Sequence, residues 1–389
     1  MTRGRFAPSP TGRMHLGNVF CALLSWLSAK SKGGEWVLRI EDLDPQRSRE
    51  EYALQLMDDL QWLGLPWDGE PVWQSQRGHI YEEYLLRLTE MGLTYPCHCT
   101  RADIMATQAP HETDGRVVYK GTCRPRAIDA INSINSINSI DAIGSIDSTI
   151  RTVPATTRLI VPDCTIPFTD GHYGPHPLNL AEHCGDYIVR RKDGAWAYQL
   201  AVVVDDALMG ITEIVRGRDL LLSSPQQIHL RELLFFERKT ENGTDAGSES
   251  RSKIYFDYAE QQGGKNREAG LKRKNNSLTA HHSPLTAHLS SPEEDVSTIR
   301  RDTPLTVNFF HHPLLCNAEG QRLCKRDKSM DLAYLRDKGT TARDIIGLLA
   351  HLAGLTNTPA PITPTELLPL FSWDKVPTED IMLDKQIIL

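Results

Sequence analysis

The sequence has no long apolar run, and none approaches the roughly 20 residues that a helix needs to cross a membrane. We also expect no secretory signal peptide, because Met1 to Arg5 lead directly into a motif rich in proline and glycine. Cysteine is scarce, with eight residues among 389, so we expect free, buried or metal-bound thiols and no disulfide framework. These absences predict a cytoplasmic protein that does not enter a membrane.

Positive charge is not in excess. The formal net charge is −7, which argues against a protein drawn as a whole to nucleic acid. Short basic tracts at 190–192 and 216–218 could still form a local basic face. The content of 40% apolar and 24% charged residues is typical of a globular protein, and the length allows two or three domains.

The dinucleotide fingerprint Gly-x-Gly-x-x-Gly is missing after the first predicted strand, which disfavours an NAD-type oxidoreductase. Residues 8–17 instead read Pro-Ser-Pro-Thr-Gly-x-x-His-x-Gly, and helical spacing of apolar residues begins near Gly17. A helix N-terminus suits a phosphate, and Ser9, Thr11 and His15 would add side-chain donors there. The prolines and glycines alone fit an ordinary capped helix equally well.

Further elements follow along the chain. Residues 35–40 predict a buried strand, and Glu41 and further carboxylates follow it. These carboxylates would lie at the carboxyl end of the strand, which is the end at which open α/β sheets bind ligands. The segment 197–206 could be part helix and part strand. The patterns also predict helices at 50–65, 81–91, 226–236 and within 331–352, and strands followed by turns at 185–194 and 210–219.

Three cysteines, Cys97, Cys99 and Cys123, have a spacing that favours a zinc site, because thiolates ligate zinc well. Spacing alone leaves the fourth ligand open, with His98 and His111 as candidates, and three unconnected cysteines are the alternative. Two low-complexity segments, 128–150 and 237–303, are predicted to be loosely packed or flexible insertions.

The motif at 8–17 resembles the ATP-binding motif of class I glutamyl-type aminoacyl-tRNA synthetases, with residues 15–18 as the "HIGH" tetrad. Residues 39–45, Arg-Ile-Glu-Asp-x-Asp-Pro, resemble a second element of that family. Residues 322–326, Arg-Leu-Cys-Lys-Arg, resemble its lysine loop, with Lys325 as the ATP-contacting lysine and Cys324 where serine is usual. The resemblance implies an α/β, Rossmann-like catalytic domain that uses glutamate and ATP, with Mg²⁺ accompanying the ATP.

The resemblance also implies the site residues. His15 and Lys325 would be catalytic, Arg5 or Arg216 would hold the side-chain carboxylate of glutamate, and Glu41 would hold its ammonium. The residues implied around glutamate are Arg5, Phe6, Ala7, Pro8, Ser9, Glu41, Tyr198 and Arg216. Those implied around ATP are Ser9, Thr11, His15, Gly17, Asn18 and Lys325.

The segment after Lys325 looks too short for the anticodon-binding domain of a full glutamyl-tRNA synthetase. In lacking that domain, the chain resembles the glutamyl-queuosine tRNA(Asp) synthetases, which transfer glutamate to queuosine in the anticodon of tRNA(Asp). Their Cys-x-Cys…Tyr-x-x-x-Cys zinc site implies Cys97, Cys99, Tyr119 and Cys123 as ligands. The alternatives are a truncated glutamyl-tRNA synthetase that charges a tRNA 3′ end, and a non-catalytic zinc-bearing adaptor.

The expected organisation has five parts and a monomeric chain. The catalytic domain would comprise 1–96 and 185–236, separated by a zinc-bearing subdomain at 97–184 that contains the 128–150 segment. A flexible insertion at 237–303 would precede the lysine loop and a helical C-terminal segment at 304–389.

Overall fold

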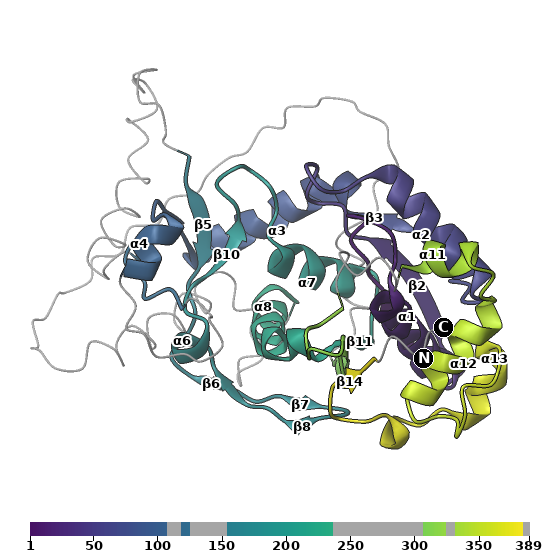
Figure 1. The fold of residues 1–389 in the computed structure, drawn as a ribbon. Coiled ribbons are helices and arrows are strands. Elements are labelled where there is room, and N and C mark those ends of the chain that lie inside the picture. The colour runs from purple at the N-terminus through teal and green to yellow at the C-terminus, as the bar shows by residue number, and fades with distance from the viewer. Residues whose placement is uncertain (107–117, 125–153, 236–305, 324–330, 384–389) are drawn as a thin grey trace, which may run out of the picture. The chain divides into compact units, whose positions relative to one another are not determined.

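The computed structural model describes residues 1–106, 118–124, 154–235, 306–323 and 331–383 (Figure 1). Both predicted insertions, 128–150 and 237–303, lie outside these ranges. The same holds for His111, Cys324 and Lys325.

A five-stranded parallel sheet forms the centre of the fold. Its order is β12-β11-β1-β2-β3, and every neighbouring pair is parallel. The first strand of the chain therefore lies in the middle, between an early strand and a late one. The strands are β1 (Arg3–Phe6), β2 (Glu35–Ile40), β3 (Val72–Trp73), β11 (Glu213–Gly217) and β12 (Asn308–His312). The predicted α/β fold with a parallel sheet is confirmed.

The two faces of this sheet are buried by different partners. Trp36, Leu38 and Ile40 belong to the hydrophobic cluster that also holds α1 (Leu16–Lys30). Val37 belongs to a separate cluster. Because successive side chains of a strand point to opposite faces, Arg39 lies on the face of Val37, away from α1.

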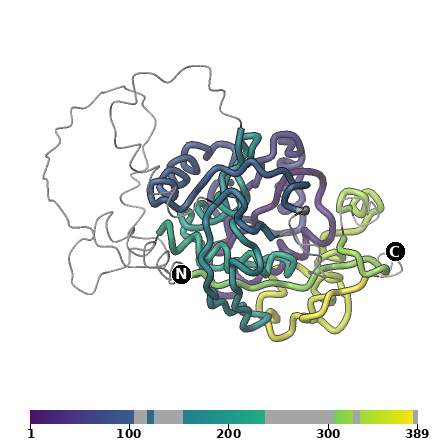
Figure 2. The backbone as a smooth tube through the Cα atoms, turned by 90° about the vertical axis from the view of Figure 1, so that its left-hand side faces the viewer, coloured from purple at the N-terminus to yellow at the C-terminus, as the bar shows by residue number. Residues whose placement is uncertain are grey.

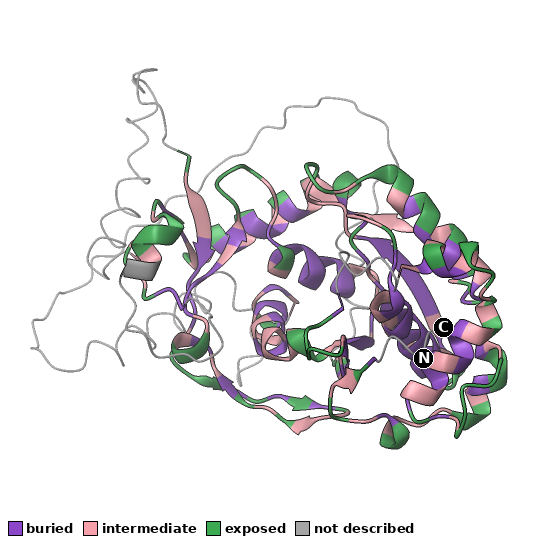
Figure 3. Ribbon diagram, viewed as in Figure 1, coloured by how far each residue is buried: buried purple, intermediate pink, exposed green. Residues whose placement is uncertain are grey.

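The helices confirm most of the sequence patterns. Beyond α1 they are α2 (Glu50–Trp62), α3 (Gly78–Glu90), α7 (Tyr198–Leu208) and α8 (Ser224–Phe235). The ambiguous segment 197–206 is helical, and α7 is buried from Leu200 to Ala207 (Figure 3). A helix buried on all sides lacks a polar stripe, so its apolar run could not be told from a strand. In the described residues, no helix combines the length and apolarity that a membrane span requires.

A three-stranded antiparallel sheet, in the order β10-β5-β4, lies between the two halves of the parallel sheet in sequence. It comprises β4 (Thr94–Cys97), β5 (Thr156–Leu159) and β10 (Tyr187–Arg190). Nearby in the chain are β6 (Thr165–Ile166), β7 (Thr169–Asp170), β8 (Gly174–Pro175), β9 (Leu178–Asn179), α4 (Arg101–Ala106) and α6 (Leu180–His183). The domain boundaries at 96/97 and 184/185 stay a prediction.

The C-terminal segment packs into the hydrophobic cluster that contains α1. Its elements are β13 (Leu315–Cys316), α11 (Leu332–Asp337), α12 (Ala342–Leu352), α13 (Pro364–Leu367) and β14 (Ile381–Met382), and β14 pairs with β13. Tyr173, in the β7–β8 turn, donates to the carbonyl of Thr378 at 2.8 Å, so this hairpin lies beside the C-terminal segment (Figure 2). Short 3₁₀ helices span Gln74–Arg77, Arg218–Ser223, Leu368–Leu370 and Trp373–Lys375.

Candidate active site

His15 is the N-cap of α1. Its Nδ1 accepts the backbone N–H of Gly17 at 3.1 Å, and Asn18 Oδ1 accepts the backbone N–H of His15 at 3.2 Å. A neutral ring that accepts at Nδ1 carries its proton on Nε2. A Cβ at Gly17 would lie 2.9 Å from His15 Cε1, so a larger residue there would displace the imidazole. The predicted motif thus folds into a capped helix start with a histidine donor.

The residues that follow the predicted lysine loop come back to this helix start. Asp331 forms a β-bridge with His15, and Leu332 donates its N–H to the carbonyl of Met14 at 2.9 Å. Lys325 itself lies outside the described residues, so its predicted role stays a prediction. The proline-rich loop is also tied to β2, because Glu41 donates its N–H to the carbonyl of Pro8 at 2.9 Å.

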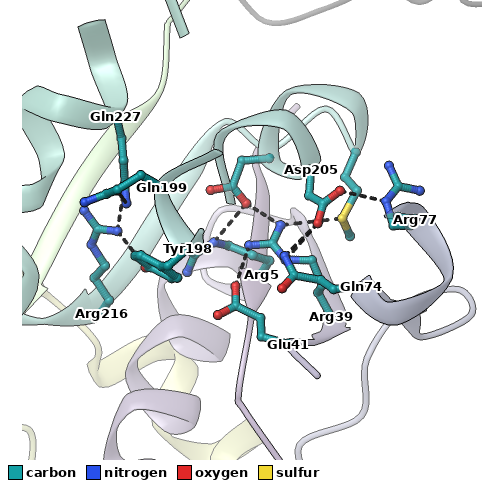
Figure 4. A network of polar contacts seen from close by, with 12 residues as sticks. Arg5, Arg39, Glu41, Gln74, Arg77, Tyr198, Gln199, Asp205, Arg216 and Gln227 are labelled. Atoms are coloured by element: carbon teal, nitrogen blue, oxygen red, sulfur yellow. Dashed lines mark hydrogen bonds and ion pairs between the residues drawn. The ribbon is translucent and has the colours of Figure 1, made fainter. Parts of the chain in front are cut away.

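Three buried arginines share one face of the parallel sheet. Phe6 and Val215 pack in the α1 cluster, so their strand neighbours Arg5 and Arg216 point to the opposite face, as Arg39 does. This face meets α7, which brings Asp205 towards the arginines (Figure 4). The next residue of α7, Asp206, also contacts them. All three arginines lie in the carboxyl-terminal halves of their strands, close to the edge at which open α/β sheets bind ligands.

Arg39 is the centre of the first network. It is fully buried, donates to Asp206 Oδ1 at 2.6 Å, and donates to Glu41 Oε1 at 3.1 Å. Arg5 Nε donates to the same Asp206 oxygen at 3.3 Å. Burial would lower the pKa of Arg39, but Asp206, Glu41 and Asp205 outweigh it and raise that pKa. Arg5 and Arg39 therefore already have anionic partners.

Arg216 is the centre of the second network, and its contacts are of another kind. Its N–H groups reach Gln227 Oε1 and Ser224 Oγ at 2.8 Å each, and His311 Nε2 at 3.0 Å. Longer contacts, at 3.4 Å each, reach Tyr198 Oη and the carbonyl of Leu220. All of these partners are neutral groups. Burial lowers the pKa of Arg216, as expected for a cation that no adjacent carboxylate among the described residues offsets.

Glu41 lies between the arginines and solvent, with 10% of its side chain exposed. Burial raises the pKa of its carboxyl above the ordinary value, and Arg39 and Arg5 offset this only in part. A carboxylate in such a place gains from an additional cation. It could therefore bind an ammonium group.

The structure thus divides the residues predicted around glutamate. Arg5 and Glu41 join the Arg39 network, whereas Tyr198, which is 37% exposed, joins Arg216. Phe6 stacks on Trp36 at 5.9 Å in the core, so only its backbone could face a ligand. Among the rest, Ser9 is exposed, Ala7, Thr11, Gly17 and Asn18 are partly exposed, and Pro8 is buried.

Sequence reasoning missed several members of these networks. Arg39 carries a visible signal, because a charged residue stands where β2 is otherwise apolar. Asp206 carries no comparable signal, because it ends a segment that could be helix or strand. His311 and its partner Asp170 are 141 positions apart, and no local pattern connects them.

The predicted zinc ligands come together as a group. The sulfur atoms of Cys97, Cys99 and Cys123 lie within 4.8 Å of one another, and Tyr119 Oη lies 3.4 Å from Cys97 Sγ. Ligands about 2.3 Å from a tetrahedral zinc would be about 3.8 Å apart, so the donor set fits such an ion. His98 is exposed and is not part of the cluster.

Tyr119 is held in this cluster from two sides. Its hydroxyl oxygen accepts the N–H of Cys123 at 2.7 Å, and its backbone bridges to Gly185. Gly185 has φ +61°, and a Cβ there would lie 2.0 Å from the carbonyl oxygen of Tyr119. Only glycine permits this approach without a shift of the backbone. With Tyr119 held in place beside them, the three thiols lie close enough together to bind a metal ion.

A cavity of about 210 Å³ lies beside α8. It shares Asp206 and Gln227 with the two networks, but its lining includes none of Arg5, Glu41 or Arg216, and most of its exposed wall is apolar. A charged, zwitterionic ligand suits the arginine networks better than this cavity.

Comparisons with known proteins identify the family of the chain. A family model described as "tRNA synthetases class I (E and Q), catalytic domain" matches residues 1–242. A protein of Nitratidesulfovibrio vulgaris, named glutamyl-Q tRNA(Asp) synthetase, is 34% identical over 397 aligned positions, which cover 100% of this chain and 97% of the relative. The chain belongs to the glutamyl-Q tRNA(Asp) synthetase family. The resemblance stated from the motifs is confirmed.

Other members of the glutamyl-Q tRNA(Asp) synthetase family are more similar over a shorter range. One from Neisseria meningitidis FAM18 is 46% identical over 235 residues, 60% of this chain and 72% of the relative. A glutamate tRNA ligase from Elizabethkingia meningosepticum, solved in complex with its amino acid, has a TM-score of 0.65 at 21% identity, over 100% of this chain and 68% of that one. That likeness shows the fold alone. As a family member the chain is a ligase of the class I synthetase type, a class that uses ATP.

Proposed function

We propose that the chain activates L-glutamate with ATP and Mg²⁺ and then transfers the glutamate to queuosine in the anticodon of tRNA(Asp). One observation carries the choice of amino acid. Arg5 is paired with Asp206, whereas Arg216 is buried among neutral partners. A buried cation without an adjacent anion is costly, and a substrate with an extra carboxylate would offset that cost.

The amino acid would bind between the two networks. Its side-chain carboxylate would accept hydrogen bonds from the Nη1 and Nη2 groups of Arg216. These bonds would replace the two 3.4 Å contacts, to Tyr198 Oη and the carbonyl of Leu220, which are weak because they are long. Its ammonium would meet Glu41, whose carboxylate Arg39 holds in place. Of the two arginines that the resemblance offered for the carboxylate, we therefore propose Arg216, with Arg5 as part of the supporting network.

Activation needs alignment and charge stabilisation more than covalent help. An oxygen of the α-carboxylate would attack the α-phosphorus of ATP, and the bond from that phosphorus to the pyrophosphate oxygen would break. His15 Nε2–H and the N-terminus of α1 would stabilise charge on the phosphates, and Lys325 would add a cation. The products are glutamyl-adenylate and pyrophosphate.

In the second step a hydroxyl of the queuosine cyclopentenediol would attack the acyl carbon of the adenylate. The bond from that carbon to the phosphate oxygen would break, AMP would leave, and the hydroxyl proton would pass to water. This acceptor is supported by the names of relatives that align with the whole chain. A tRNA substrate would also fit the predicted cytoplasmic location.

We further propose that Cys97, Cys99, Tyr119 and Cys123 hold a zinc ion. The ion would tie the end of β4 to residues 118–124, which approach each other through these side chains. Zinc bound by four protein ligands supplies folding energy and leaves no coordination position for substrate. The role proposed for the ion is structural.

One experiment separates the acceptors. The chain is incubated with labelled glutamate, ATP and tRNA(Asp), with or without queuosine, and with or without the 3′-terminal adenosine. We expect labelling that requires queuosine and survives removal of the adenosine. Labelling that ignores queuosine and requires the adenosine would indicate a truncated glutamyl-tRNA synthetase instead. Absence of glutamate-dependent ATP–pyrophosphate exchange would indicate a non-catalytic adaptor.

A further inference from the structure

A buried chain of three polar side chains runs behind the proposed carboxylate site. Arg216 and His311 are register partners on β11 and β12, and Arg216 Nε donates to His311 Nε2 at 3.0 Å. His311 Nδ1 lies 2.6 Å from Asp170 Oδ2. The three residues are at most 4% exposed. Their order in space is carboxylate, imidazole and guanidinium.

Asp170 is fixed by a different part of the chain. It ends β7, and its Oδ1 accepts the backbone N–H groups of His172 at 3.0 Å and Tyr173 at 2.9 Å. The next residue, Gly171, donates its N–H to the carbonyl of Phe309 at 2.7 Å, which anchors the hairpin on β12. The carboxylate therefore approaches the imidazole from a second element, which backbone hydrogen bonds hold against the strand of His311.

These contacts determine where the imidazole proton lies. Burial would raise the pKa of Asp170, but hydrogen bonds from His311 and from the backbone outweigh it and lower that pKa. Burial lowers the pKa of His311 to about 4, so the ring is neutral at pH 7. An ionised carboxylate can only accept, so Nδ1 carries the proton and Nε2 presents a lone pair to Arg216.

We propose that His311, held in this tautomer by Asp170, is a positioning residue for substrate carboxylate recognition. It orients the guanidinium of Arg216 through a neutral acceptor, so the guanidinium keeps its charge for the substrate. A carboxylate at the same place would neutralise Arg216, as Asp206 does for Arg5. This inference rests on the proposed role of Arg216 in glutamate binding.

The test compares two substitutions of the same histidine in glutamate-dependent ATP–pyrophosphate exchange. His311→Leu removes the acceptor, and we expect it to raise the KM for glutamate about 10-fold, because a misplaced guanidinium would lose about one charge-assisted hydrogen bond to the substrate. The KM for ATP should change less than about 3-fold. His311→Gln keeps a neutral oxygen acceptor and should recover most of the glutamate affinity.

Asp170→Asn supplies a second variant if His311→Leu fails to fold. The amide N–H would face Nδ1 and move the ring proton to Nε2, against the N–H of Arg216, so the KM for glutamate should rise again. The control is His312→Leu. His312 is equally buried, but it packs on Phe20 towards α1 and should cost stability without a selective change in the glutamate KM.

Nitrogen-15 spectra of labelled histidine, assigned with the His311→Gln variant, should show His311 protonated at Nδ1 only. A doubly protonated ring, or a folded His311→Leu enzyme with an unchanged glutamate KM, would overturn the proposal. A His311→Gln variant as impaired as His311→Leu would overturn it too. A wild-type chain without glutamate-dependent exchange would overturn the proposed function instead, and the spectrum would still report the tautomer.

Discussion

Arg39 Nη1 donates to Asp206 Oδ1 at 2.6 Å, which joins the second strand of the sheet to helix α7 through a buried ion pair. The same guanidinium donates to Glu41. One residue thus links β2 to α7 and positions Glu41, the carboxylate proposed to receive the substrate ammonium. The proposed site therefore predicts that changes at Arg39 affect both stability and glutamate binding.

Replacing Arg39 by Met should lower the free energy of unfolding by about 3–5 kcal/mol, because it leaves Asp206 and Glu41 as less compensated buried carboxylates. Arg3→Met is the control, since Arg3 pairs with Glu35 at 3.2 Å but both side chains are about 40% exposed. That change should cost about 1 kcal/mol or less. Urea unfolding of both variants tests this, and equal losses would contradict it.

Replacing Arg216 by Gln should raise the KM for glutamate about 10- to 100-fold, because it removes the cation proposed to bind the side-chain carboxylate. Arg5→Gln should raise that KM less, since Arg5 is already paired with Asp206. Exchange kinetics with varied glutamate measure both. If Arg5→Gln proves the more damaging to glutamate KM while the KM for ATP stays constant, the assignment of the two arginines is reversed.

The raised pKa of Glu41 predicts a pH dependence. Only the carboxylate form binds an ammonium, so kcat/KM for glutamate should be highest above this pKa and should fall as the pH drops through it. Because burial raises the pKa, the fall should begin above the usual glutamate value of about 4.3. Glu41→Gln should abolish that inflection. A wild-type profile that stays flat until the protein unfolds would contradict the role of Glu41.

The metal proposal predicts about one zinc ion per purified chain, measured by elemental analysis. Cys97→Ala should lose the ion and lower the melting temperature. Tyr119→Phe should keep three thiolates and bind zinc more weakly. Cys164→Ser is the control, because Cys164 is exposed and lies outside the cluster. Unchanged zinc affinity in Tyr119→Phe would remove the phenolate from the ligand set.

Much of this fold could be predicted from local patterns. The turn before α1, the strand at 35–40 and the helices α2, α3 and α8 follow from spacing and composition. The spacing of the three cysteines predicted a shared site, the family resemblance added Tyr119, and the structure brings their side chains together. Segment 197–206 stayed ambiguous because its apolar, β-branched run fits a buried strand as well as a helix.

The site was harder to predict than the fold, because its contacts join residues that are far apart in the sequence. Nothing in the sequence distinguishes Arg5 from Arg216, since each is an arginine on a strand of the same sheet. The difference comes from α7, which brings Asp206 to one of them and not to the other. The pairing of His311 with Asp170 likewise depends on a hairpin that meets the edge strand of the sheet.

A crystal structure with a non-hydrolysable glutamyl-adenylate analogue would test the central claim most directly. We predict that the side-chain carboxylate lies within hydrogen-bonding distance of Arg216, that the ammonium lies beside Glu41, and that the phosphate lies at the start of α1 near His15. An analogue bound in the apolar cavity beside α8, or with its carboxylate on a residue other than Arg216, would contradict the proposed site.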